Sequence, residues 1–134
     1  MLFRSDGDDY WVWEAVRAIS PRVVVIEYNA SFGSSRSVTV PYRRSFDRYK
    51  EHVSGFYHGA SLLALTRLAQ RKGYLLAGCD SRGTNAFFVR EDAASGRIEP
   101  VDVAAAFFPL YERGHLSVDQ QFRTIEHLEL VEIE

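Results

Sequence analysis

Two segments of the chain carry the clearest pattern of apolar and polar positions. Residues 22–28 contain an unbroken apolar run over 23–26, in which every side chain is β-branched. A run without alternation is typical of a strand covered on both faces, as in parallel sheets. Residues 60–72 repeat leucine and alanine at three- and four-residue spacing and stop before Gly73. That period predicts an amphipathic helix whose end is marked by the glycine.

A further helix is predicted over residues 10–20, because Pro21 follows as a residue that ends helices. The acidic turn over 6–9 supplies N-cap residue types and negative charge, which suit a helix N-terminus. The helix would bury a stripe made of Val12, Ala15, Val16 and Ile19. Two tryptophans lie off that stripe, and we expect one in the core and one on a surface available for an interface: Trp11 and Trp13.

Weaker signals complete the order of elements. They predict a strand over 2–5, an extended piece over 38–40, a hairpin of strands 74–79 and 85–90, a helix over 101–110, and a final strand or tail over 128–133. Residues 29–59 are interpreted as one long connection with at most a short helical turn, and such connections are usually functional or interface-forming. The sequence thus predicts an α/β fold with a small mixed sheet, in the order β-α-β-loop-α-β-β, and a terminal antiparallel hairpin.

Composition narrows the class of protein. With 134 residues, 46% of them apolar, and a net charge of −2, the chain can form one packed domain and does not resemble a disordered segment. No apolar run approaches the ~20 residues of a membrane span, so we expect no membrane partner. A single cysteine, Cys79, excludes an intramolecular disulfide, and residues 1–10 lack a signal-peptide core. These features favour a cytoplasmic location.

Charge is distributed unevenly. Residues 1–67 carry nine basic and seven acidic side chains, and residues 68–134 carry seven and eleven. Opposite halves could attract a second copy head to tail, although a solvated acidic C-terminal segment is the more usual meaning of such a pattern.

Six short stretches stand in an order and spacing that become specific only in combination. They are Asp6-Gly7-Asp8-Asp9-Tyr10-Trp11, Arg22-Val23-Val24-Val25-Ile26-Glu27-Tyr28-Asn29, Gly59-Ala60-Ser61-Leu62, Arg71-Lys72-Gly73-Tyr74, Gly78-Cys79-Asp80-Ser81 and Asn85-Ala86-Phe87-Phe88-Val89-Arg90. Together with the element order, they resemble the C-terminal half of a Rossmann-like S-adenosylmethionine-dependent methyltransferase, more narrowly the FkbM-type group and its relatives. The resemblance covers most of residues 5–92. Residues 93–134, the predicted helix and acidic tail of the same single domain 1–134, add little to it.

The resemblance also implies parts that this chain lacks. It implies a Gly-rich cofactor loop and a ribose-binding acid upstream of residue 2, and no G-x-G-x-x-G pattern occurs in residues 1–134. It further implies an acid two positions before Asp6, where this chain has Arg4. Methyl transfer depends chiefly on positioning the sulfonium methyl in line with its nucleophile. We therefore expect no catalytic residue and no cofactor in the lone chain, with S-adenosylmethionine bound only where a partner chain completes the site.

Any inherited ligand site is expected beyond the carboxyl ends of the predicted strands, where ligands bind in open α/β sheets. The candidates are Asp6, Asp8, Asp9, Glu27, Tyr28 and Asn29, with Tyr10 and Trp11 as walls. The alternative is that the acids cap the following helix and the polar residues end a strand. His58 beside Ser61 could bind an anion at a helix start, although Ser61 is more simply the N-cap.

Other chemistry finds little support in the sequence. The four histidines do not stand at metal-ligand spacing, so no metal is assigned. A basic and aromatic stretch over 42–50 could stack on single-stranded nucleic acid, but the isoelectric point near 6.1 argues against it. A solvated or interface loop is the preferred interpretation of that stretch.

Half of a sheet should leave an open edge at its first strand and uncovered apolar faces, which a partner must protect. We therefore expect self-association, most simply a twofold homodimer. The favoured hypothesis is a non-catalytic interaction or small-ligand-binding module. The alternatives are a methyltransferase subunit completed by a second chain and a nucleic-acid-binding module.

Overall fold

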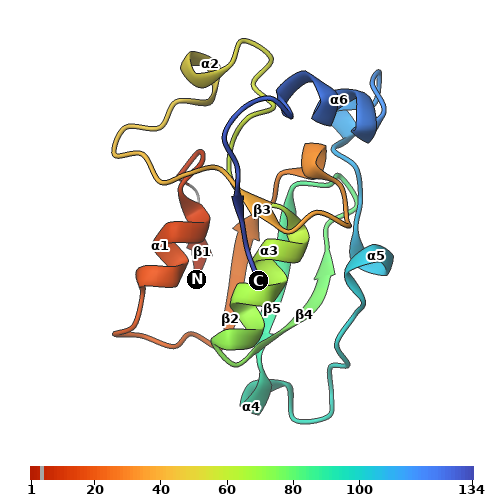
Figure 1. Cartoon of the computed structure of the whole chain (residues 1–134). Helices are drawn as coiled ribbons and strands as arrows, with labels where there is room; N and C mark the ends of the chain where they lie inside the picture. The colour runs from red at the N-terminus through yellow and green to blue at the C-terminus, as the bar shows by residue number, and fades with distance from the viewer. Residues whose placement is uncertain (4) are drawn as a thin grey trace.

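The computed structural model describes residues 1–3 and 5–134 and shows a small mixed α/β protein (Figure 1). Its main sheet has the strand order β1-β2-β5-β4, formed by Leu2–Phe3, Val23–Glu27, Asn85–Arg90 and Tyr74–Cys79. Strand β1 runs parallel to β2, and the other two pairings are antiparallel. The predicted mixed sheet and its terminal antiparallel hairpin are therefore confirmed. The predicted first strand is shorter than expected, and its Arg4 lies outside the described residues.

Helices α1 (Asp9–Ala15) and α3 (Leu62–Arg71) lie together on one face of the sheet (Figure 1). The core between them is centred on Trp13, whose ring lies 5.3 Å from the ring of Phe88 and 5.8 Å from that of Tyr74, centroid to centroid. Phe3 closes the cluster from β1, at 6.2 Å. This aromatic contact explains the docking of α1 on the sheet.

The predicted apolar stripe of the first helix is wrong. Tyr10 and Trp13 face the core, whereas Val12 is 40% exposed, because the larger aromatic rings occupy the sheet side of the helix. The helix also ends earlier than residue 20. Lys72 at the end of α3 donates from Nζ to the carbonyl oxygens of Glu14 (3.4 Å) and Val16 (2.9 Å), which satisfies the carbonyls where α1 stops.

The long connection between β2 and α3 contains short elements. These are the 3₁₀ turn η1 (Ala30–Phe32), strand β3 (Val38–Thr39) and helix α2 (Arg48–Glu51). Strand β3 pairs antiparallel with the last strand, β6 (Val131–Glu132), in a separate two-stranded sheet. A second apolar cluster lies under the connection and holds it to the C-terminal segment: Phe32, Val38, Val40, Phe56, Tyr57 and Ile125.

The C-terminal third differs most from the sequence prediction. In place of one helix over 101–110 there is only α5 (Val103–Ala106), followed by extended chain. The N–H of Val101 donates to the Leu76 carbonyl at the edge of β4 and holds this part of the chain against the sheet. Pro109 disfavours helix at the residue before it, so residues 107–110 continue as an extended segment, called the strap below. Three further elements were not predicted from the sequence: α4 (Glu91–Ala94), the turn η2 (Tyr111–Arg113) and α6 (Val118–Ile125).

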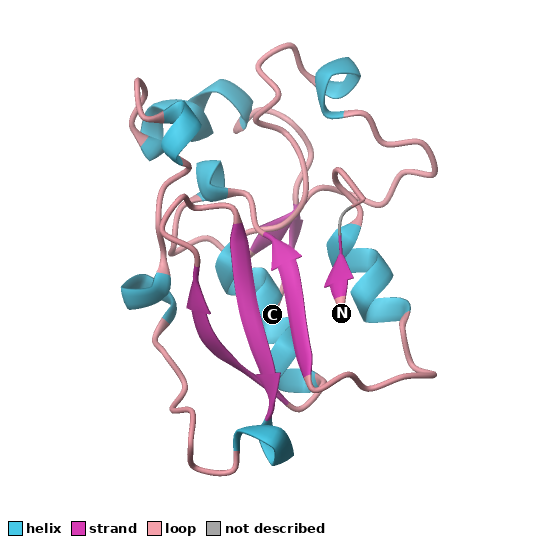
Figure 2. Ribbon diagram, turned by 180° about the vertical axis from the view of Figure 1, so that it is seen from behind, coloured by secondary structure: helices cyan, strands magenta, loops and turns pink. Residues whose placement is uncertain are grey.

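Among the residues that the structure describes, no helix lies over the sheet face opposite α1 and α3 (Figure 2). Side chains on a strand alternate between faces. Val24 and Ile26 are buried on the helix side, so Val23 and Val25 lie on the opposite face. Their register partners Leu2, Phe87 and Val89 lie there with them. The apolar run of β2 predicts cover on both faces; helices cover one, and on the other face Val89 is buried while Val23 and Phe87 are exposed. Among the described residues, no helix is long and apolar enough to cross a membrane.

Candidate functional site

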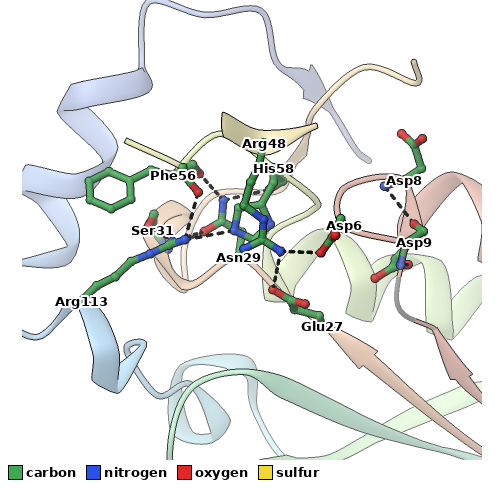
Figure 3. A network of polar contacts seen from close by, with 12 residues as sticks. Asp6, Asp8, Asp9, Glu27, Asn29, Ser31, Arg48, Phe56, His58 and Arg113 are labelled. Atoms are coloured by element: carbon green, nitrogen blue, oxygen red, sulfur yellow. Dashed lines mark hydrogen bonds and ion pairs between the residues drawn. The ribbon is translucent and has the colours of Figure 1, made fainter. Parts of the chain in front are cut away.

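The parallel pairing of β1 and β2 brings the two predicted acidic ends together at one edge of the sheet (Figure 3). Asp6 follows β1 and Glu27 ends β2, and both approach Arg48 of α2. The Arg48 Nη2 atom lies 3.0 Å from Asp6 Oδ1 and 3.5 Å from Glu27 Oε1. A cation from the long connection therefore occupies the place between the two carboxylates.

The turn over residues 5–9 is shaped to receive that connection. The ring of Phe46 packs so closely on Gly7 that a Cβ there would lie 2.2 Å from a ring carbon. Only glycine leaves this space. Asp6 has a φ of 57°, which aspartate tolerates better than most residues. Gly7 and Asp6 thus allow the turn to pack closely against Phe46 of the long connection.

Asp8 and Asp9 do not form the side-chain cap that the alternative interpretation expected. Asp9 Oδ1 accepts a hydrogen bond from the N–H of Ser5 at 2.6 Å, and Asp8 stands at the N-cap position without a side-chain cap bond. Asp8 Oδ1 is buried and has no hydrogen-bond partner among the described residues. Burial raises the pKa of Asp8, with a smaller contribution from the charge of Asp9.

The expected aromatic walls are structural contacts. The Tyr10 hydroxyl accepts a hydrogen bond from Arg71 Nη2 (2.9 Å), and the Trp11 indole donates to the carbonyl of Val40 (2.9 Å). Tyr28 donates from its hydroxyl to the carbonyl of Phe108 at 2.6 Å. The last contact holds the 107–110 strap against β2. Tyr10 and Trp11, the two predicted walls, are thus hydrogen-bonded to other parts of the chain.

Asn29 and His58 meet in a buried network centred on Arg113, which the sequence analysis did not identify (Figure 3). Arg113 Nη1 donates to Ser31 Oγ (2.8 Å) and Asn29 Oδ1 (3.3 Å). Its Nη2 donates to the carbonyl of Gly55 (3.0 Å) and lies 3.3 Å from His58 Nε2. A guanidinium has donors only, so His58 Nε2 accepts, and the imidazole proton resides on Nδ1.

The network continues on both sides of the guanidinium. Asn29 Nδ2 donates to the carbonyls of Phe56 (2.6 Å) and His58 (2.8 Å), and Ser31 Oγ donates to Gln121 Oε1 (2.6 Å). Three distant parts of the chain are joined in this way: the end of β2, the 55–58 loop and the C-terminal segment.

Burial controls the ionisation of the network. It lowers the pKa of His58 well below its usual value, and the positive charges of Arg48 and Arg113 add to the effect. Burial also lowers the pKa of Arg113, helped by the charge of Arg48. The histidine is thus neutral at neutral pH. The guanidinium of Arg113 thus binds Asn29, Ser31, Gly55 and His58 and holds the loops that carry them together.

The remaining predicted features have simple structural roles. Ser61 is the N-cap of α3, as expected, and its Oγ accepts hydrogen bonds from the N–H groups of Ala64 and Val38, both at 3.1 Å. Burial raises the pKa of Cys79 to about 12, which keeps the thiol protonated. Within residues 1–3 and 5–134, no group of three or more His, Cys, Asp or Glu side chains could hold a metal ion.

The basic and aromatic stretch over 42–50 pairs most of its charge internally. Besides Arg48, Arg43 lies 3.5 Å from Glu51, and Lys50 lies 3.7 Å from Asp47. Cations that already face carboxylates are poorly placed to neutralise phosphates. The preferred interpretation of this stretch, a solvated or interface loop, agrees with this pairing.

Arg113 could not be located from the sequence, because a single arginine between Glu112 and Gly114 has no motif around it. Asp6 and Glu27 would have to release Arg48 before either could bind a cationic cofactor such as the one the family resemblance implies. Comparison of the chain with family models, with curated proteins and with solved structures gave no match.

Proposed function

We propose that this chain is a non-catalytic interaction module, derived from half of a methyltransferase-like sheet, that assembles with a second copy of itself through the uncovered face of its main sheet. The observation that carries the proposal is the apolar character of that face. Leu2, Val23 and Phe87 are 59%, 42% and 36% exposed, although all three belong to strands.

These side chains form two continuous rows across the sheet. The register places Leu2, Val25 and Phe87 side by side in one row. The neighbouring row contains Val23, Leu75 and Val89, of which Val89 is already buried, at 7% exposure. Neither row contains a charged side chain. Two apolar sheet faces pack ~10 Å apart with their strands nearly aligned, so a second copy related by a twofold axis offers the same surface in return.

The open edge of the sheet at β1 is the other surface that a second copy could cover. Strand β1 is an edge strand, as predicted, but it spans only two residues. A short edge offers few free backbone groups, which is one way in which proteins limit edge-to-edge pairing. The face therefore contributes more to the proposed contact than the edge does.

The proposal is tested by the mass of the protein in solution. We expect a dimer at micromolar concentration for the natural chain and a monomer for Val23→Lys, because a buried lysine without a partner strongly disfavours the interface. Val53→Lys is the matched control, since Val53 is 87% exposed and lies in the distant loop after α2. Circular dichroism checks that all three are folded. A natural chain that stays monomeric at ~100 µM would contradict the proposal.

A methyltransferase subunit completed by another chain is the second candidate. The parallel pairing of β1 with β2 favours it, because a sheet that begins with a parallel edge strand could continue into a partner's parallel strands. Calorimetric titration of S-adenosylmethionine distinguishes the two. Binding that appears only after a second chain is added favours the methyltransferase subunit. Binding by the lone chain contradicts both the interaction module and the subunit.

A further inference from the structure

A hollow of about 430 Å³ lies between the β4–β5 turn and the segment from Phe108 through the start of α6. Its volume falls within the ~300–1,000 Å³ of small-molecule sites. The residues that line it include no charged side chain, and they are mainly apolar: among them Phe108, Pro109, Leu110, Tyr111, Leu116 and Val118. It lies beyond the carboxyl end of β4, at the edge of the sheet where ligands of open α/β folds bind.

The walls of the hollow are held in place by hydrogen bonds. The N–H of Tyr111 donates to the carbonyl of Arg82 (2.9 Å), and Phe108 is bound to the Tyr28 hydroxyl through both its N–H and its carbonyl. The buried amide of Gln121 donates to the carbonyls of Leu116 (3.0 Å) and Arg113 (3.3 Å). A ligand would therefore find a formed site and need not order the segment.

Exposed aromatic surface marks the mouth. Tyr111 is 71% exposed and Phe108 is 40% exposed. The Arg82 guanidinium lies 4.7 Å from the centre of the Tyr111 ring and pairs with Glu112, which orients the ring although it faces solvent. At the same rim, the Ser81 hydroxyl makes no hydrogen bond with the residues that the structure describes. The hollow thus combines apolar walls, an exposed aromatic ring beside a guanidinium, and the Ser81 hydroxyl.

We propose that this hollow binds a small, uncharged aromatic compound that carries a hydrogen-bonding group. The lining is uncharged, and the Arg82 guanidinium at the mouth is already paired with Glu112, so an ionised ligand would find no free counter-charge. The Tyr111 ring stacks on the ligand, and Ser81 supplies the hydrogen bond. The site shares no residue with the uncovered sheet face, so it does not depend on self-association.

Indole is a suitable probe, because it is planar, uncharged and carries one N–H donor. Titration of the full chain, followed by two-dimensional NMR of the backbone amides, should give saturable shifts confined to residues 81–83 and 108–121. Indole-3-acetate, which has the same ring and a negative charge, should bind at least ~10-fold more weakly.

Variants at the mouth test the assignment without disturbing the core. Tyr111→Ala should weaken binding about fivefold, as expected for the loss of an aromatic contact. Tyr42→Ala is the matched control, since Tyr42 is 62% exposed on another loop. Ser81→Phe places a ring in the mouth and should abolish binding.

Three results would overturn the proposal. They are the absence of saturable indole binding at ~10 mM, equal affinity of the Tyr111→Ala and natural chains, and shifts centred on the sheet face. The oligomer measurement described above is independent of each of them.

Discussion

Arg113 connects more segments than any other described side chain of the polar network, since its guanidinium contacts the end of β2, η1 and the 55–58 loop (Figure 3). Each acceptor is a group that water would otherwise bind. Removing the guanidinium leaves buried acceptors without partners, and each of these costs more than an ordinary hydrogen bond is worth.

Arg113→Leu should therefore lower the free energy of unfolding by about 3 kcal/mol, the range for breaking a buried charged network. Arg123→Leu, at an exposed position of α6, should change it by less than ~0.5 kcal/mol. Urea unfolding of the two variants measures the difference. Equal stabilities would show that the network contributes little.

His58 makes the same network sensitive to pH. Its pKa in the folded chain lies below the unfolded value, so between the two values the unfolded chain binds the extra proton. The contribution of His58 to the free energy of unfolding is therefore fully present above pH 6.5. Below that pH the free energy of unfolding falls by up to ~1.4 kcal/mol per pH unit. His58→Gln should remove this slope between pH 5 and 6.5, and His115→Gln, at an exposed position, should retain it. Unfolding free energies at four pH values would decide.

At the scale of elements, the interior of each strand and of α3 could be predicted, and most ends could not. The β-branched run of β2, the leucine period of α3 and the glycine-containing turn of the hairpin are local signals, and they were sufficient. The end of α1 depends on Lys72, and the strap after α5 depends on the edge of β4. Both are contacts between residues far apart in sequence, which periodicity cannot report. Helix α6 had a recognisable signal, the Ser117-x-x-Gln120 capping box.

The start of α3 gives a prediction at this scale. Ser61→Ala removes the N-cap acceptor and also leaves the buried N–H of Val38 unpaired, so the free energy of unfolding should fall by about 2 kcal/mol. Ser35→Ala, at an exposed position, should have almost no effect. Thermal melting of both variants provides the measurement. A change below ~0.5 kcal/mol for Ser61→Ala would mean that water replaces the hydroxyl.

For the whole molecule, the sequence could predict that Asp6 and Glu27 lie near each other, but not that both pair with Arg48. The rule that strand carboxyl ends share an edge correctly brought Asp6 and Glu27 together. It could not indicate that Arg48 lies between them, because the connection that carries Arg48 has no regular period. Helices cover one face of the main sheet, and the pattern of β2 predicts burial of both. That difference is the strongest reason to expect a second copy.

The C-terminal segment also affects how the chain is made. Loop 55–58 and β3 are completed by Arg113, Ile125 and β6, residues that a ribosome adds well after them. At ~5–20 residues per second, about 4 to 15 s pass between the synthesis of residue 60 and that of residue 133. Throughout that interval, the polar ends of β2 and the apolar residues beneath the connection lack their covers. A chaperone that shields the nascent connection should therefore have its largest effect on this protein before residue 133 is added, and little effect afterwards.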